Sequence, residues 1–234
     1  MKRLRPKAYV RTAIVGLVVA LLAGCSPLYT LDASITSTPA TQLNLSHLET
    51  ERVAVMGLVA PANLQGFNPS LSLALVNAIA KVRPPFRAIP AYETTNLLNQ
   101  HRFAKDYGDL LSGFVLSGIL DQQRLRRIGS ALCARYLLLP GLAEFDQSII
   151  DKFDFLGVKL LRNRVTTLRL WLQLWDAQTG QILWESSGEV TAVTQLINTK
   201  KTVPVDEIAQ KLWLQMIQEG LFGAKTETRL FLRD

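Results

Sequence analysis

Hydrophobic and polar residues alternate most strictly between residues 165 and 175. Leucines fill every second position there, and polar or aromatic side chains fill the others: Leu168, Leu170, Leu172 and Leu174 against Thr167, Arg169, Trp171, Gln173 and Trp175. A period of two puts all of the leucines on one face of a β-strand. The turn-forming segment 176–181, with Gly180 expected at positive φ, leads to a returning strand over 182–190. The pattern predicts a β-hairpin with a buried leucine face.

The rest of the chain mixes short apolar runs with segments of helical period. Apolar runs predict three further strands, over 52–59, 86–90 and 136–145, and the first suits a strand covered on both faces. Helical spacing predicts four helices, over 70–82, 92–100, 122–134 and 204–220. Ser70 and Asp121 are candidate N-caps, and Gly220 a helix end. Three glycines leave the segment 106–118 undecided.

These elements predict an α/β fold, in which a mixed sheet packs with helices as a two-layer or three-layer sandwich. The single domain is expected over residues 51–223. Residues 25–50 are rich in Ser, Thr and Pro without a helical or strand period, which is typical of a flexible tether. Residues 224–234 are expected to form a C-terminal tail.

Three tryptophans of the hairpin allow two interpretations. Trp171 and Trp175 share the face opposite the leucines, and Trp184 lies on the returning strand. They can form cross-strand aromatic pairs or lie beneath a helix layer, or they can present an aromatic surface to a partner subunit. The first interpretation is favoured because cross-strand aromatic pairs are common.

The first 24 residues have the parts of an export signal. Five basic residues and no acid precede an apolar run that is shorter than the roughly 20 residues of a membrane-spanning helix. The run ends in Leu22, Ala23, Gly24 and Cys25, which resembles a bacterial lipobox. The resemblance implies that a signal peptidase recognises the first three residues, cleaves after Gly24 and leaves a lipidated Cys25. An ordinary signal peptide with a chance cysteine is the alternative, and the joint presence of all three regions favours the lipoprotein.

A lipidated Cys25 would hold the protein on a membrane without a spanning helix. Stable anchoring takes at least two acyl chains, each contributing about 0.8 kcal/mol per buried methylene, and a triacylated cysteine meets that condition. Ser26, rather than Asp, follows the cysteine. In the sorting rule of enteric lipoproteins, this implies the outer membrane, on the periplasmic side, of a Gram-negative host.

Charge and cysteine content narrow the remaining classes. The formal charge is +7, but the signal peptide holds five of the 26 basic residues and none of the 19 acidic ones, which leaves 21 against 19. A nucleic-acid partner is therefore not inferred. If Cys25 carries lipid, Cys133 has no partner within the chain, which excludes a disulfide framework. Cys133 lies in an apolar stretch and is predicted to be a buried, inert thiol.

Sequence patterns that carry chemistry are missing. The chain has two histidines, His47 and His101, and no His or Cys spacing typical of a metal site. It has no phosphate-binding loop and no nucleophile motif, and Asp151 and Asp154 suit solvated loop acids. We therefore expect no catalytic residue, metal or cofactor, and a protein that is not an enzyme.

Two longer motifs resemble a known group of proteins. They are Ile128-Gly129-x-x-Leu132-x-Ala134-x-Tyr136-Leu137-Leu138 and Asp176-x-x-Thr179-Gly180-x-Ile182-x-Trp184. With the order of elements, they resemble over residues 52–222 the superfamily of the curli secretion lipoprotein CsgG, the Pel-export lipoprotein PelC and the penicillin-binding-protein activator LpoB. Members often have Gly-Ala-Asp before the tyrosine, where this chain has Cys133-Ala134-Arg135.

The resemblance implies a non-catalytic periplasmic domain that assembles with protein partners of the envelope. One form is a component of a cell-envelope export or secretion system, working as a homo-oligomeric ring. The alternative is a monomeric regulator that docks on a periplasmic cell-wall synthase. Residues 146–164 alternate imperfectly and hold at most one pair of membrane strands of roughly 9–11 residues, so a pore is the weaker variant. A lip or an oligomer contact suits their apolar content.

Overall fold

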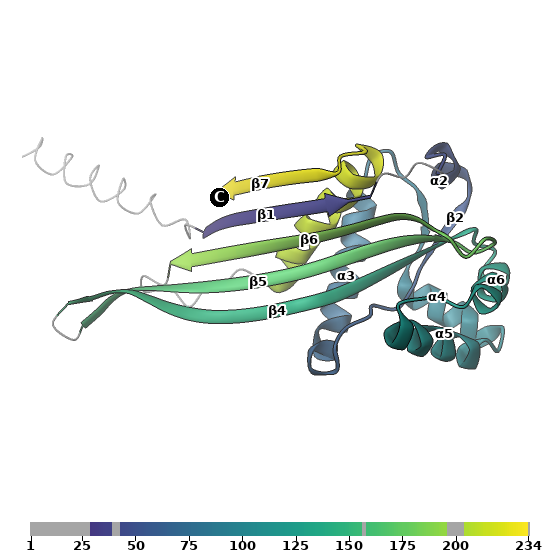
Figure 1. Ribbon diagram of the computed structural model, residues 1–234, viewed down its shortest axis with the longest axis horizontal. Coiled ribbons are helices and arrows are strands. Elements are labelled where there is room, and N and C mark those ends of the chain that lie inside the picture. Colours follow the sequence, from purple (N-terminus) through teal and green to yellow (C-terminus); the bar gives the residue numbers. More distant parts are fainter. Residues whose placement is uncertain (1–28, 39–42, 156–157, 196–203, 234) are drawn as a thin grey trace, which may run out of the picture.

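One seven-stranded sheet runs along the molecule (Figure 1). The computed structural model describes residues 29–38, 43–155, 158–195 and 204–233. In chain order the strands are β1 (Tyr29–Ser37), β2 (Arg52–Val55), β3 (Arg87–Ile89), β4 (Tyr136–Phe155), β5 (Val158–Asp176), β6 (Ile182–Gln195) and β7 (Glu227–Arg233). Across the sheet the order is β3-β2-β4-β5-β6-β1-β7. β2 pairs in parallel with β3 and β4, and all other pairs are antiparallel, which confirms the predicted mixed sheet.

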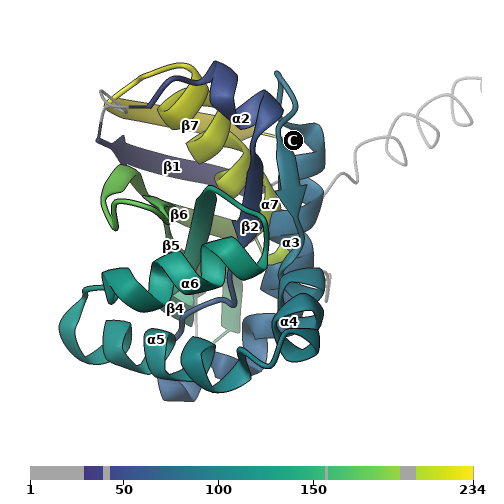
Figure 2. The same cartoon turned by 90° about the vertical axis from the view of Figure 1, so that its right-hand side faces the viewer.

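Helices lie on both faces of the sheet. On one face are α3 (Asn68–Lys81) and α7 (Val205–Gln215), which continues as a π-helical segment, η2 (Met216–Phe222). On the other are α4 (Ala91–Gln100), α5 (Ala104–Ser117) and α6 (Gln122–Ala131), gathered at the end where β2 lies (Figure 2). The short helices α2 (Ser46–Thr50) and η1 (Ala62–Phe67) lie in connections. The sandwich therefore has three layers at this end and two at the other.

The alternation of β2 divides the interior into two cores. Val53 and Val55 point into the larger core, beneath α3 and α7. Ala54 and Met56 point into the smaller core, beneath α4, α5 and α6. All four residues are at most 1% exposed, so the predicted burial of this strand on both faces is confirmed.

The predicted hairpin is confirmed, with Gly180 at φ +72° in its turn. The four leucines of the alternating segment, Leu168, Leu170, Leu172 and Leu174, are buried in the larger core. Trp184 pairs with Leu174 and is buried on the same face, whereas Trp175 is buried in the smaller core. These two tryptophans therefore lie beneath the helix layers, which is one form of the favoured interpretation, but Trp184 lies opposite a leucine and not opposite an aromatic residue.

The two chain ends differ from the prediction. A flexible tether over residues 25–50 and a tail over 224–234 are the expectations, but the structure places Tyr29–Ser37 and Glu227–Arg233 in the sheet as β1 and β7. β1 buries Leu31, Ala33 and Ile35 and exposes the residues between them. This two-residue period is weak beside the many Ser and Thr residues, and the strand is stabilised by β6, its distant neighbour in sequence.

Local turn geometry explains three further differences. The undecided segment 106–118 is helical, and its Gly118 ends α5 in the left-handed region at φ +72°. Cys133 is exposed at φ +48° and not buried, because α6 ends at Ala131 and the chain turns away from the apolar face. Gly220 does not end a helix but lies buried within η2, where a Cβ would be 2.2 Å from the Ser37 hydroxyl.

Of the two predicted N-caps, Asp121 is confirmed and Ser70 is wrong. Asp121 is the N-cap of α6, and its carboxylate accepts a hydrogen bond from the Arg124 N–H. Ser70 is not a cap, because α3 already begins at Asn68 with Pro69 in its first turn.

The predicted export signal 1–24, the lipidation site Cys25 and the sorting residue Ser26 lie outside the described residues. Among the helices that are described, none has the length and apolar character needed to cross a membrane.

Candidate interaction surface

The β4–β5 hairpin extends beyond its neighbours in the sheet (Figure 1). β4 has 20 residues and β5 has 19, whereas β6 has 14 and β1 has nine. β2 pairs with β4 only over 136–138, and one further bridge joins Val59 to Gly141. From Ala143 to Phe155, the outer edge of β4 therefore has no strand beside it among the described residues. Such an edge offers N–H and C=O groups to another strand.

The solvent exposure of the β4 side chains shows where the hairpin extends beyond the packed part of the domain. In β4, Phe145 still contacts a helical segment, with its ring 4.6 Å from that of Phe67 in η1. The next five residues, 146–150, are all exposed, although they alternate between the two faces of the strand. Ile149 and Ile150 are 58% and 48% exposed. An apolar, two-faced exposure of this kind suits a contact with another molecule.

On the sheet face opposite α3 and α7, the helices α4, α5 and α6 cover only the end where β2 lies (Figure 1). A row of side chains crosses this face from β4 to β7, and neighbours in the row are paired residues: Glu144, Arg169, Glu189, Ser34 and Arg229. The Arg169 guanidinium lies 3.0 Å from the Glu144 carboxylate and 2.6 Å from that of Glu189. Its hydrogen bond and attraction to Glu189, helped by Glu144, raise the pKa of Arg169.

An apolar strip on α5 and just after it forms a second exposed surface. Val115, Leu116 and Ile119 are 66%, 89% and 67% exposed. Beside the strip is a groove of about 400 Å³ between α5 and the segment that follows β2. Its lining residues are Leu58, Val59, Ala60, Gln65, Asn68, Leu111, Ser112, Val115 and Leu116.

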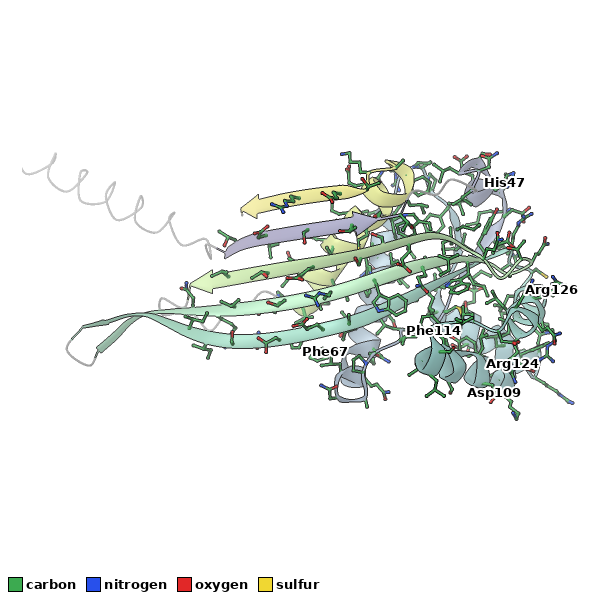
Figure 3. All side chains as sticks on the ribbon, in the orientation of Figure 1. His47, Phe67, Asp109, Phe114, Arg124 and Arg126 are labelled. Atoms are coloured by element: carbon green, nitrogen blue, oxygen red, sulfur yellow. The ribbon has the colours of Figure 1, made fainter. Side chains whose placement is uncertain are left out.

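Two contacts hold α5 against the sheet. The Tyr107 hydroxyl accepts a hydrogen bond from the Gly57 N–H at 2.5 Å, and burial raises the pKa of Tyr107 although this bond acts in the opposite direction. Phe114, labelled in Figure 3, packs on Trp171 with ring centroids 5.8 Å apart. The Trp171 indole in turn covers Gly141, where a Cβ would lie 1.8 Å away. The apolar strip is therefore presented by a helix in a defined position.

A polar pocket of about 250 Å³ lies at the end of α6 and contains Cys133. Its two arginines already have structural partners. Arg135 lies 3.2 Å from the Asp176 carboxylate, and Arg126 donates two hydrogen bonds to the Gln178 carbonyl. Both side chains therefore contact the β5–β6 turn or the strand end beside it.

The structure does not gather the chemically active side chains. The Nδ1 atom of His47 lies 3.5 Å from the Tyr136 hydroxyl, whereas His101 is the C-cap of α4. Asp151 and Asp154 belong to β4, not to a loop. Across residues 29–38, 43–155, 158–195 and 204–233, no three His, Cys, Asp or Glu side chains lie together in a way that could hold a metal ion.

Sequence reasoning missed the charged row and the unpaired edge of β4. A visible signal was the presence of Glu144 after the apolar run 136–143 and of Arg169 between two leucines. Their pairing depends on the bulge between Leu142 and Glu144, which shifts the register by one residue. A shift of one residue moves the side chains of a strand to its other face. The sequence alone therefore could not predict which charged side chains lie side by side in the row.

Comparisons with known proteins give similar structures but no family. No family's sequence profile matches the chain, and no curated protein matches it. Similar solved structures include the PelC dodecamer from Paraburkholderia phytofirmans, with TM-score 0.43 and 14% identity over 80% of this chain and 96% of that one. The lipoprotein GNA1162 from Neisseria meningitidis has a TM-score of 0.41 and 15% identity, over 74% of this chain and 96% of that one. The LpoB C-terminal domain from Salmonella enterica has a TM-score of 0.33 and 17% identity, over 59% of this chain and 81% of that one. Scores and identities this low do not assign a function.

Proposed function

We propose that the protein is an outer-membrane-anchored periplasmic lipoprotein that acts as a non-catalytic assembly component of a cell-envelope export or secretion system. The lipobox ending at Cys25 supports the anchor, and Ser26 supports the outer membrane. The class of machine follows from the resemblance of the two motifs described above. In this role the chain binds other protein subunits and transfers no chemical group.

One observation of the fold carries the assembly role. The β4–β5 hairpin projects from the domain with Ile149 and Ile150 exposed, and in the part of the chain that the structure describes no strand pairs with its outer edge over 143–155. Proteins that work alone blunt or cover such edges, because an open edge pairs with other chains. A projecting hairpin with this edge is therefore suited to subunit contact.

The apolar strip on α5 favours a second candidate, a monomeric regulator that docks on a periplasmic cell-wall synthase. Leu116 is 89% exposed beside a groove of about 400 Å³, and a partner helix or loop could cover both. This candidate predicts a monomer with one partner patch, whereas the first predicts a large contact between copies.

Lipidation is tested by labelling cells with radioactive palmitate. The wild-type chain should incorporate label, and Cys25→Ser should not. Cys133→Ser removes the other cysteine of the chain and is the matched control, which should keep the label. Label that persists in Cys25→Ser would contradict the proposed anchor.

The two candidates are separated by the molar mass of the natively acylated protein, measured by light scattering after detergent extraction. A discrete multiple of the 26.0 kDa precursor, corrected for signal removal and lipid, supports the assembly component. A monomer contradicts it and favours the regulator. For the regulator, Leu116→Ser should weaken binding to a purified cell-wall synthase at least tenfold, whereas Leu73→Ser, at an exposed leucine of α3, should not.

A further inference from the structure

The unpaired edges of the sheet lie on its two sides over the same half of the molecule. From Ala143 onward β4 is the outermost described strand on one side of the sheet, and β7 is the outermost described strand on the other side. We infer that β7 of a second copy of this chain adds in parallel to the outer edge of β4. This inference rests on the proposed assembly role and names the partner and the contact for it.

The charge of the two edges favours a contact between β4 and β7 over a contact between two copies of the same edge. The open edge of β4 carries four acidic residues and one basic residue, namely Glu144, Asp146, Asp151, Asp154 and Lys152. β7 carries Arg229 and Arg233 against Glu227. By sequence the β4 edge has a net charge of −3 (one basic residue against four acids) and β7 has +1 (two basic residues against one acid), so two copies of the same edge would carry charge of the same sign. Like charges opposite each other destabilise a strand pair and unlike charges stabilise it, so each edge favours the other kind.

Strand direction agrees with a parallel contact. Four antiparallel pairings lie between β4 and β7, so the two strands run the same way (Figure 1). A second copy in the same orientation therefore brings its β7 parallel to β4. This edge already accepts one parallel neighbour, because β2 pairs in parallel with β4 nearer the helices.

The charged row sets the register of the contact. Within one copy the row is acidic at Glu144, basic at Arg169, acidic at Glu189, neutral at Ser34 and basic at Arg229. If Arg229 of one copy lies beside Glu144 of the next, charges of opposite sign meet across the contact. Glu144 is 45% exposed and Arg229 is exposed, so both can reach a neighbouring chain.

The contact uses two different surfaces, so a pair of copies still has one free β4 edge and one free β7 edge, on different copies. A contact of this type repeats from copy to copy and closes into a ring or continues as a filament, whereas a pairing of two identical edges stops at a dimer. The difference provides the test.

Cross-linking tests the contact in the full-length, acylated protein. We place Ala143→Cys and Thr228→Cys in a chain that carries Cys133→Asn. Neighbouring strands lie about 4.8 Å apart, within the Cα separation of about 4.4–6.8 Å that a disulfide needs. Mild oxidation should give a ladder of multiples of the protomer on a non-reducing gel. Ala143→Cys with Gln178→Cys, which is exposed on the β5–β6 turn, is the control pair and should give no ladder.

A second variant tests the charge pair without a new bond. Arg229→Glu should lower the molar mass of the detergent-extracted protein to that of the protomer at a protein concentration where the wild-type chain assembles. Arg52→Glu makes the same change at an exposed arginine of β2 and should leave the mass unchanged. Equal thermal unfolding midpoints for the two variants establish that the loss of assembly is not a loss of folding.

Three results would overturn the inference. Equal ladders from the test and control pairs exclude the β4–β7 contact, and dimers from Ala143→Cys alone show that β4 pairs with itself. In either case a multimeric wild-type mass leaves the proposed assembly role intact. A wild-type chain that is a monomer removes both the contact and the assembly role.

Discussion

The two ends of the sheet are built from the same strands in different ways. Near β2, helices cover both faces, and side chains on each side of β4 and β5 are buried, as Leu139 and Leu172 show. At the far end one face is bare, the outer edge of β4 is unpaired, and residues 146–150 are exposed. We expect the buried end to supply most of the stability and the exposed hairpin at the far end to be free to contact other molecules.

The largest effect is expected from shortening a leucine at the buried end. Leu172 is 0% exposed, so Leu172→Ala should lower the free energy of unfolding by about 2–5 kcal/mol through lost burial and a cavity. Ile150→Ala, on the hairpin, should change it by less than about 0.5 kcal/mol. Urea unfolding of both variants measures the contrast, and equal losses would show that the hairpin belongs to the folded core.

A smaller loss is expected where Trp171 covers the backbone of β4. Gly141→Ala places a methyl group against the indole and should cost about 1–3 kcal/mol while displacing Phe114 and α5. Because Trp171 moves, its fluorescence should shift together with the unfolding midpoint. Gly113→Ala, in α5 with open space around it, is the control and should not destabilise the protein.

The hydrogen bond that joins α5 to β2 should contribute less. Tyr107→Phe leaves the Gly57 N–H without its partner and should cost about 1–3 kcal/mol, a range whose lower half suits this partly exposed site. Chemical denaturation measures the loss, and Tyr92→Phe, at an exposed tyrosine of α4, should be neutral.

The same tyrosine predicts a dependence on pH. Burial raises the pKa of Tyr107 above the ordinary value of 10.0, so the neutral phenol is favoured in the folded state. Its contribution to stability is complete below pH 10 and is lost as the pH rises through the folded-state pKa. The stability difference between the wild-type chain and Tyr107→Phe should therefore shrink above pH 10, and a difference that grows would contradict this assignment.

The smallest effect is a gain. Cys133 occupies the left-handed region, which costs a residue with a Cβ roughly 1–2 kcal/mol, and glycine avoids that strain. Since glycine also loses about 0.5–1 kcal/mol of chain entropy, Cys133→Gly should stabilise the protein by up to about 1 kcal/mol. Cys133→Ala keeps the strain and should not, and a thermal unfolding scan of the two variants separates the causes.

Elements with a strong local signal could be predicted from the sequence. The strict alternation of β5 required a buried leucine face, and Asp121 before an amphipathic segment required a helix start. The mixed α/β sheet follows from such signals. Weak local patterns could not be assigned: β1 and β7 are short strands at the chain ends, and only their pairing with β6 and with each other makes them part of the sheet.

The candidate surface depended still more on the tertiary structure. The sequence by itself predicted a lipobox at Cys25, and it determined the alternation of β5 and the acidic character of the far half of β4. Only the tertiary structure decided that Glu144 and Arg169 are neighbours and that Cys133 faces solvent. It also decided that the pairing of β2 with β4 stops before Ala143. The physical reason is that periodicity is a property of adjacent residues. Strand order, register and open edges arise from contacts between segments that are far apart in the chain.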